Sequence, residues 1–230
     1  YQLKQSKKIL IANRGVIAIR ALRAARELGY SVASVYSTID RDQKHLKLSD
    51  EAICIGPPET KDSYLNEAAI ISAAELSGAD AIYPGFGFLA ENASFAEKCR
   101  ESGFKFIGPD PEVIAIMGDK IKAKELAKSL NIPVVPGYEG EISTENEAIK
   151  IVEEIGYPVI IKASAGGGGR GMRVVNSSDE LWQSIQSAQN EAELAFGDGK
   201  IFIEKYLKKP RHIEVQIFGN GKGEAVHLFT

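Results

Sequence analysis

The sequence predicts an α/β protein whose first part is a helix-covered parallel sheet and whose second part is an α+β unit. In the first half, short apolar runs alternate with helical patterns, which is typical of parallel sheets with helices on both faces. From Phe202 onward, short apolar runs follow one another without helical patterns, which indicates antiparallel strands. Four glycines, Gly166–Gly169, separate two further apolar runs and predict a strand–loop–strand unit.

Glycines mark the ends of helices in the first half. Gly29 ends the first expected helix and Gly78 follows the second, because glycine readily closes a helix.

Ligands gather at the carboxyl ends of parallel strands, where Asn13–Gly15 and Pro84–Gly87 are expected. The expected strands are residues 8–12, 32–36, 52–55, 81–83 and 105–107, and the expected helices are residues 17–28, 66–76 and 91–101.

The second half begins with two helical segments and a stretch resembling a linker, Pro133–Gly140. Thr144 is the expected N-cap of the next helix, with Glu147 placed to complete a capping box, and Ser178 is the expected N-cap of a later helix. We expect the boundary between the two parts near residues 115–133. The expected helices are residues 111–117, 119–130, 145–155 and 179–192, and the expected strands are residues 159–161, 172–175, 202–206, 212–218 and 224–228.

Composition excludes several classes of function. The chain has 230 residues, 44% of them hydrophobic and 26% charged, and a net charge of −3, so no broad basic surface for nucleic acid is expected. No stretch approaches the ~20 apolar residues of a membrane span. The N-terminus does not resemble a signal peptide, whereas a removed transit peptide stays open. Cys54 and Cys99 are expected to be free thiols in a reducing compartment, and the three histidines have no metal-ligand spacing.

The glycine-rich run is the strongest functional signal. Gly166, Gly168 and Gly171 match G-x-G-x-x-G, but a strand rather than a helix follows, which excludes a dinucleotide fold, and no P-loop motif occurs. A glycine loop lets backbone N–H groups approach a polyphosphate, and Lys162 at the end of an apolar strand can supply a cation. The alternative is a surface hairpin without a ligand. We also expect residues 164–171 to form a mobile lid loop.

Several segments together resemble the N-terminal half of biotin carboxylases, members of the ATP-grasp superfamily. The resemblance covers nearly all 230 residues in the family's order. Two positions depart from the family pattern, since Val16 and Thr230 stand where the family usually has glutamate. The matching segments are Lys8–Gly15, Asp40–Asp42, Ser63–Asn66, Tyr83–Asn92, Phe106–Pro109, Met117–Lys120, the glycine loop, Glu204–Leu207 and Pro210–Glu214.

The resemblance implies four parts. Residues 1–115 would be a Rossmann-like, pre-ATP-grasp N-terminal domain with a parallel sheet, and residues 116–133 a helical connector. Residues 134–205 would be the α+β lid subdomain of the ATP-grasp fold. Residues 206–230 would be the first strands of its C-terminal subdomain, so we expect the chain to be a fragment with a truncated last sheet.

The resemblance also implies an ATP site. Lys120 and Lys162 would contact phosphates, the glycines would supply N–H groups, and Glu204 would accept from the adenine amine or a ribose hydroxyl. The alternatives are a solvated lysine at position 120, a plain strand end at Glu204–Leu207 and a structural histidine at position 212. Arg14, Glu91 and a Glu214 ion pair are expected to be structural. The implied ATP-binding residues are Lys120, Lys162, Gly166, Gly167, Gly168, Gly169, Met172, Glu204, Lys205, Tyr206, Leu207 and His212.

The implied reaction is ATP-dependent carboxylation of biotin on a carrier protein, using bicarbonate through carboxyphosphate, within an acyl-CoA carboxylase. ATP is the implied cosubstrate and biotin the carried substrate. Mg²⁺ or Mn²⁺ would be held by ligands from the family's C-terminal half, with no catalytic or metal-binding residue in this fragment. The fragment alone is therefore expected to be inactive.

The implied partners are a biotin carboxyl carrier protein or domain, a carboxyltransferase subunit or domain, and a second copy of the full-length chain as a homodimer. No nucleic acid and no membrane is expected. The implied location is the cytoplasm, or the mitochondrial matrix or plastid in a eukaryote. Two alternatives stay open: an enzyme similar to carbamoyl-phosphate synthase, and a non-catalytic nucleotide-binding or assembly module. The final acyl acceptor stays open as well.

Overall fold

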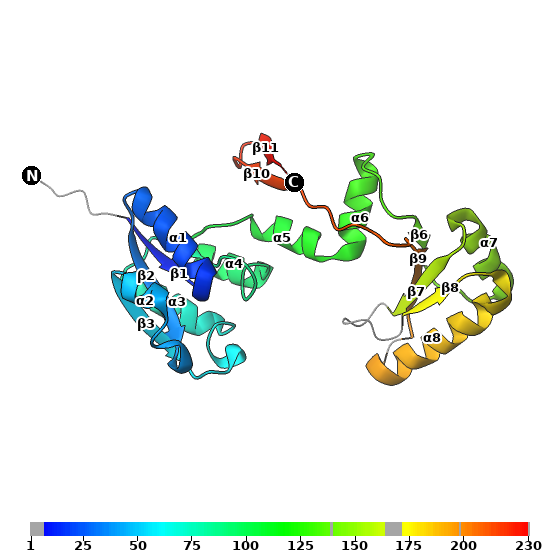
Figure 1. Ribbon diagram of the computed structural model, residues 1–230, viewed down its shortest axis with the longest axis horizontal. Coiled ribbons are helices and arrows are strands. Elements are labelled where there is room, and N and C mark those ends of the chain that lie inside the picture. The colour runs from blue at the N-terminus through cyan, green and yellow to red at the C-terminus, as the bar shows by residue number, and fades with distance from the viewer. Residues whose placement is uncertain (1–6, 139, 164–171, 198, 230) are drawn as a thin grey trace, which may run out of the picture. The chain divides into compact units, whose positions relative to one another are not determined.

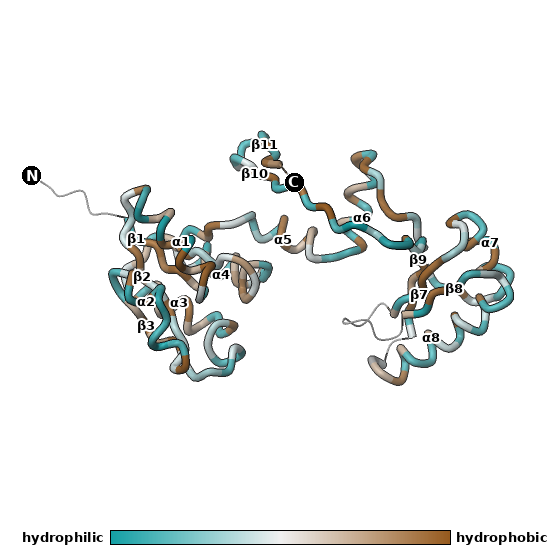
Figure 2. The backbone as a smooth tube through the Cα atoms, viewed as in Figure 1, coloured by the Kyte–Doolittle hydropathy of each residue, from teal (hydrophilic) through white to brown (hydrophobic). Residues whose placement is uncertain are grey.

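The computed structural model describes residues 7–138, 140–163, 172–197 and 199–229 (Figure 1). The chain divides into two compact units, Tyr1–Ser129 and Leu130–Thr230. Each unit has its own sheet, with hydrophobic residues along the central strands β1 and β7 (Figure 2). The finer division into four parts stays a prediction.

The first unit contains a five-stranded sheet with the order β3-β2-β1-β4-β5. Its neighbouring strands are parallel, which confirms the predicted α/β class. The order places β1 at the centre, so the loops that follow β1 and β4 lie at the same edge of the sheet. The strands are β1 (Lys8–Ile11), β2 (Ser31–Ser37), β3 (Glu51–Gly56), β4 (Ala81–Tyr83) and β5 (Lys105–Phe106).

Helices cover both faces of this sheet. The evidence is that alternate residues of β1 pack in different hydrophobic cores. Leu10 packs with residues of α3 (Glu67–Ser77) and α4 (Ala93–Glu101). Ile11 packs with Leu22 and other residues of α1 (Gly15–Glu27). The short helix α2 (Lys44–Leu48) and the 3₁₀ turns Thr38–Asp40 and Thr60–Asp62 were not predicted.

Asparagine residues form the N-caps of two of these helices, α3 and α4. The Asn66 side chain accepts a hydrogen bond from the Ala69 backbone N–H at 3.1 Å, and that of Asn92 accepts from Phe95 N–H at 2.9 Å. The predicted helix start at Glu91 was therefore two residues early, because Asn92 caps the helix. The unit ends with α5 (Pro111–Gly118) and α6 (Lys120–Ser129), close to their predicted bounds.

Protonation of His45 is expected to destabilise the first unit. His45 is fully buried, and burial lowers its pKa below the ordinary 6.5. Below about pH 6.5 the unfolded chain binds a proton that the folded chain does not, so stability falls until the pH reaches the folded pKa. We expect the melting temperature to drop between pH 7.5 and 5.5, and calorimetry should show a smaller drop for His45→Gln. Equal drops in both proteins would contradict this.

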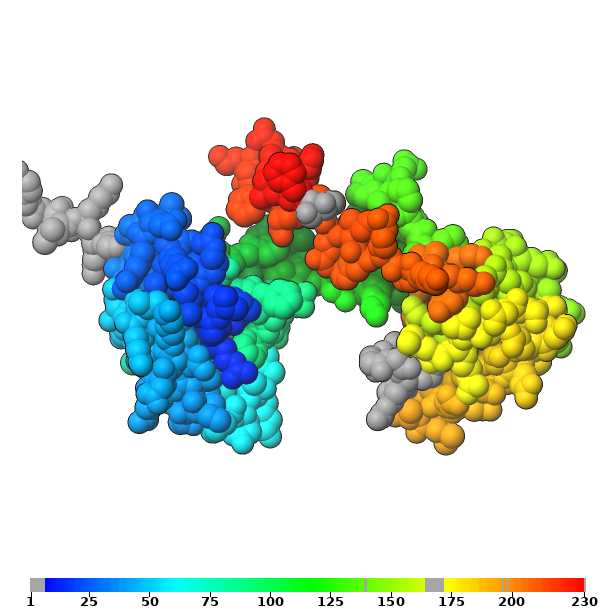
Figure 3. All heavy atoms as spheres, viewed as in Figure 1, coloured from blue at the N-terminus to red at the C-terminus, as the bar shows by residue number. Residues whose placement is uncertain are grey.

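The second unit contains a four-stranded sheet with the order β6-β9-β7-β8, whose pairs are antiparallel. Val159, Ile161 and Ile203 are fully buried with residues of two helices, α7 (Glu145–Ile155) and α8 (Leu181–Phe196). Figure 3 shows α8 in yellow to orange as a continuous layer on this unit. The strands are β6 (Gly137–Tyr138), β7 (Val159–Ala163), β8 (Arg173–Val175) and β9 (Ile201–Lys205).

Three predictions in the second unit were wrong. Residues 133–140 are not only a linker, because they contain β6. Ser178 does not cap α8, since Ser178–Glu180 form a 3₁₀ turn and the helix begins at Leu181. Residues 212–215 are not part of a strand, because the last hairpin consists only of β10 (Gln216–Gly219) and β11 (Ala225–Leu228).

The N-cap of α7 at Thr144 was predicted correctly, whereas the Glu147 side chain bonds to the N–H of Ser143 and not, as a capping box requires, to that of Thr144. The Thr144 hydroxyl accepts from Glu147 N–H at 3.3 Å, while the Glu147 carboxylate accepts from Ser143 N–H at 3.1 Å. Thr144→Ala should lower the free energy of unfolding by ~1 kcal/mol. Urea unfolding followed by fluorescence of Trp182, which packs against this unit's core, measures it. An unchanged midpoint would contradict the prediction.

Candidate functional site

The four-stranded sheet of the second unit has two unlike faces. One face packs on α7 and α8 and is buried, whereas side chains on the other face are half-buried or exposed. Strand register places the latter on one side, because Ile160 pairs with both Val174 and Glu204, and Lys162 pairs with Phe202. We call Ile160, Lys162, Val174, Phe202 and Glu204 the open face.

Two predicted site residues meet on the open face. The Lys162 Nζ lies 2.7 Å from Glu204 Oε2, and their side chains are 31% and 18% exposed. The same ammonium lies 5.6 Å from the centroid of the Phe202 ring. A lysine at the end of an apolar strand needs a partner, and the structure supplies one that is itself a predicted nucleotide contact.

Gly137 was missed by sequence reasoning, although it lies beside this pair. Gly137 lies in β6 and pairs with Glu204 of β9 in the sheet register. A Cβ on Gly137 would lie 2.8 Å from the Ile203 carbonyl oxygen and 3.1 Å from Glu204 Cγ. Glycine therefore leaves room for the Glu204 side chain. Its signal in the sequence is the Pro136-Gly137 pair, which instead suggested a linker.

The segment after Glu204 is tied to the start of β7. The Lys205 ammonium donates to the carbonyl oxygens of Gly156 and Tyr157 at 2.9 and 2.7 Å. The Tyr206 backbone N–H donates to the Pro158 carbonyl oxygen at 2.9 Å. Leu207, the next residue, is 50% exposed. The side chain of Lys205 thus links the end of β9 to the residues before β7. This leaves the Lys205 backbone as the group that could contact a ligand.

The remaining predicted residues lie in several places. Lys120 is exposed at the start of α6 in the first unit, whereas Met172 lies beside β8 in the second and is 48% exposed. The His212 Nε2 lies 2.7 Å from Glu214 Oε1, and both side chains are largely exposed outside any strand. A structural role for Glu214 stays a prediction. Gly166, Gly167, Gly168, Gly169 and the predicted mobile lid lie outside the described residues.

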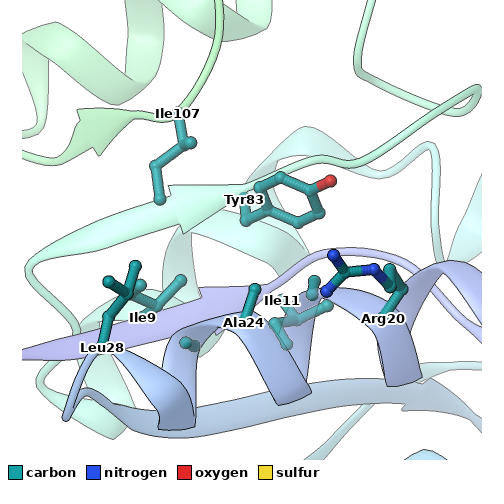
Figure 4. A pocket seen from close by; sticks show the side chains of 9 residues that line it. Ile9, Ile11, Arg20, Ala24, Leu28, Tyr83 and Ile107 are labelled. Atoms are coloured by element: carbon teal, nitrogen blue, oxygen red, sulfur yellow. The ribbon is translucent and has the colours of Figure 1, made fainter.

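Hollows occur among the described residues of the first unit. One, of about 610 Å³, is lined by the predicted Lys120 together with Glu91, Met117 and mostly apolar neighbours. Another, of about 390 Å³, lies between α1 and the strands β1 and β4 (Figure 4). Ile9, Ile11, Leu28, Tyr83 and Ile107 make it apolar, and Arg20 is the charged member of its lining. It contains no predicted site residue.

A buried polar cluster fills the carboxyl edge of the parallel sheet. The Asp40 Oδ2 accepts from Tyr64 Oη at 2.8 Å, Ser37 Oγ at 2.9 Å and Arg14 Nη1 at 3.1 Å. Burial opposes ionisation of Asp40, but these hydrogen bonds prevail and hold its pKa below the usual value. The Arg14 guanidinium also lies 5.2 Å from the Tyr64 ring centroid and 5.6 Å from that of Phe88. Arg14 is thus bound within the fold, as its structural reading expects.

The loops after β1 and β4 are joined by one buried side chain. The Asn13 amide donates to the carbonyl oxygens of Pro84 and Phe86 at 2.8 and 2.9 Å. Gly85 is required there, since its φ is +74° and a Cβ would lie 2.9 Å from Asn13 Nδ2. Sequence reasoning placed both loops at this edge but missed the Asp40 cluster, which joins residues far apart in the chain.

Within the described residues, no three histidine, cysteine or acidic side chains are arranged to hold a metal ion. In the same part of the chain, no helix is long and apolar enough to cross a membrane.

Comparisons with known proteins agree over nearly the whole chain. Residues 5–114 match the family "Biotin carboxylase, N-terminal domain", and residues 119–230 match "Carbamoyl-phosphate synthase L chain, ATP binding domain". The biotin carboxylase of Pseudomonas aeruginosa is 54% identical over 223 residues, which are 96% of this chain and 50% of that protein. The chain thus spans about half the length of the curated relatives it matches.

Solved structures give the same answer. A biotin carboxylase–β-γ-ATP complex from Campylobacter jejuni matches with a TM-score of 0.81 and 52% identity, over 96% of this chain and 50% of that one. The biotin carboxylase domain of a thermophilic 2-oxoglutarate carboxylase bound to bicarbonate matches with a TM-score of 0.88 and 45% identity, over 96% and 48%. The chain therefore belongs to the biotin carboxylase family, whose N-terminal domain and ATP-binding domain it carries in sequence.

Proposed function

We propose that the chain is the nucleotide-binding part of an enzyme that carboxylates biotin on a carrier protein, using ATP and bicarbonate through carboxyphosphate. The observation that carries this is the Lys162–Glu204 pair on the open face, in a chain of this family. The Campylobacter jejuni relative forms a complex with β-γ-ATP, and the 2-oxoglutarate carboxylase domain binds bicarbonate.

Each described residue of the site has a proposed task. The Lys162 ammonium binds phosphate oxygens, and Lys120 is the second phosphate lysine. The backbone of Glu204–Leu207 contacts adenine, with Leu207 and Met172 packing against the base. His212 contacts the nucleotide. Glycines 166–169 are proposed to donate backbone N–H groups to the phosphates, as a glycine-rich loop allows.

Phosphoryl transfer depends on position and charge, because its transition state spreads negative charge over phosphate oxygens. A fixed ammonium stabilises that charge, and it acts more strongly in a site from which water is excluded. A divalent cation, Mg²⁺ or Mn²⁺, would neutralise phosphate charge as well. The described residues do not fit such a cation, so its ligands would come from other residues.

We expect the 230-residue chain alone to show no bicarbonate-stimulated ATP hydrolysis. The physical reason is that phosphoryl transfer without a held metal loses a main source of charge neutralisation. Phosphate release from Mg-ATP, measured with and without bicarbonate, tests this. A clear bicarbonate-stimulated rate would mean that residues 1–230 already contain the catalytic groups.

The proposed partners follow from the reaction. A biotin carboxyl carrier protein or domain presents biotin, a carboxyltransferase subunit or domain takes the carboxyl group onward, and the full-length protein forms a homodimer. We propose an acyl-CoA carboxylase as the setting. The proposed location is the cytoplasm, or the mitochondrial matrix or plastid in a eukaryote.

The deciding experiment follows labelled bicarbonate. The full-length protein that contains this chain should transfer label to biotin only when ATP is present. Mass spectrometry of the carboxylated product of the complete system then names the acceptor. Label appearing in carbamoyl phosphate with ammonia, and not in biotin, would favour an enzyme similar to carbamoyl-phosphate synthase. ATP binding without either product would favour a non-catalytic module.

A further inference from the structure

Lys162, the lysine proposed to bind phosphate, already forms an ion pair in this structure. Its Nζ lies 2.7 Å from a carboxylate oxygen of Glu204, which is the distance of a charge-assisted hydrogen bond. The two residues come from neighbouring strands, and the register Ile160↔Glu204 and Lys162↔Phe202 makes them diagonal neighbours on the open face. The contact is therefore a product of the fold rather than of local sequence, since 42 residues separate the partners.

The surroundings favour this contact. The Lys162 and Glu204 side chains are only 31% and 18% exposed, so water screens them less than it screens a surface pair. Gly137, opposite Glu204 on the neighbouring strand β6, has no side chain that would push the carboxylate away, since a Cβ there would lie 3.1 Å from Glu204 Cγ. Phe202 lies under the ammonium, with 5.6 Å between the Nζ and the ring centroid.

A polyphosphate that approaches Lys162 meets this carboxylate as well. The ammonium and the carboxylate together carry no net charge, so the pair attracts an anion far less than a lone ammonium would. A phosphate oxygen must either take the ammonium away from Glu204 or lie beside a second negative group. Both routes weaken phosphate binding.

We propose that the Glu204 carboxylate binds the Lys162 ammonium when no nucleotide is bound, and that it competes with polyphosphate for this ammonium. This inference rests on the proposed function, because it concerns the same nucleotide site. Glu204 would then have two tasks in turn. It holds the Lys162 ammonium before binding, and it releases the ammonium to phosphate when the nucleotide enters, which frees its carboxylate for the nucleoside.

Inorganic tripolyphosphate tests the competition, because it has no base or ribose to contact Glu204. Its affinity is measured by calorimetry in the full-length protein without divalent cations. Glu204→Gln keeps the side-chain shape and should bind tripolyphosphate about tenfold more tightly, a gain within the range of coupling between contacting charges. Lys162→Met should bind it more weakly, and Lys162→Met with Glu204→Gln should show no gain over Lys162→Met.

Glu191→Gln is the matched control. It removes one negative charge from the same unit and breaks an ion pair with Arg173, whose register partner Ile161 lies on the helix-covered face. Its tripolyphosphate affinity should equal that of the parent protein.

Three results would overturn the proposal: equal or weaker binding by Glu204→Gln, a gain that persists without Lys162, or no tripolyphosphate binding by any variant. The labelled-bicarbonate assay separates this from the proposed function. Biotin carboxylation without the Lys162–Glu204 coupling overturns only the competition. Coupling without carboxylation overturns only the biotin carboxylase function.

Discussion

Lys162→Met should reduce ATP-dependent turnover of the full-length protein by roughly 10²-fold or more, which corresponds to about 2.7 kcal/mol of transition-state stabilisation. Methionine keeps the length and the apolar stem of lysine but removes the charge that would contact phosphate oxygens. The fold should survive, because Lys162 lies on the open face and methionine fits the same position on strand β7.

The matched control for Lys162 is Lys150, an exposed residue of α7 in the same unit. Lys150→Met removes the same charge from the opposite side of the sheet and should leave turnover unchanged. Steady-state ATP hydrolysis, together with circular dichroism of both variants, makes the comparison. Unchanged turnover in Lys162→Met would remove this lysine from the site.

Truncation of two adjacent isoleucines on β7 should have different effects, one mainly on stability and the other mainly on nucleotide binding. Ile161 is fully buried against α7 and α8, so Ile161→Ala should cost about 2–5 kcal/mol of stability through a cavity in the core. Ile160 lies on the half-buried open face, so Ile160→Ala should cost roughly 1 kcal/mol or less while it weakens nucleotide binding.

Urea unfolding followed by Trp182 fluorescence, and ATP binding measured by calorimetry, separate the two effects. Both substitutions remove the same kind of atoms from neighbouring positions, so each serves as the control for the other. Similar losses of stability would mean that both faces of the sheet are covered. A loss of ATP binding only in Ile161→Ala would place the nucleotide elsewhere.

The fold of the first unit could be predicted because its signals are local. Apolar runs such as Val32–Tyr36 alternate with helical patterns, and this alternation indicates a parallel sheet before any contact is known. The cap of α7 at Thr144 is equally local. Two-residue strands such as β6 have no periodicity to detect, so the stretch around Gly137 suggested only a linker.

The candidate site could be predicted one residue at a time but not as contacts. Lys162 and Glu204 were each identified separately, whereas their ion pair depends on the register of β7 with β9. The Asp40 cluster likewise joins side chains from three segments, which no sequence spacing reveals. Ser178 was a wrong cap because a serine before acidic residues also suits a 3₁₀ turn, which the chain adopts there.

Photolabelling with 8-azido-ATP tests the central claim, that the open face of the second unit binds the nucleotide. The azide sits on the base, so it should label the segment proposed to contact adenine. We predict that the labelled peptide contains residues 201–207 or Met172, and that excess ATP prevents the labelling. Label on α7 or α8, or label that ATP does not compete away, would contradict the account.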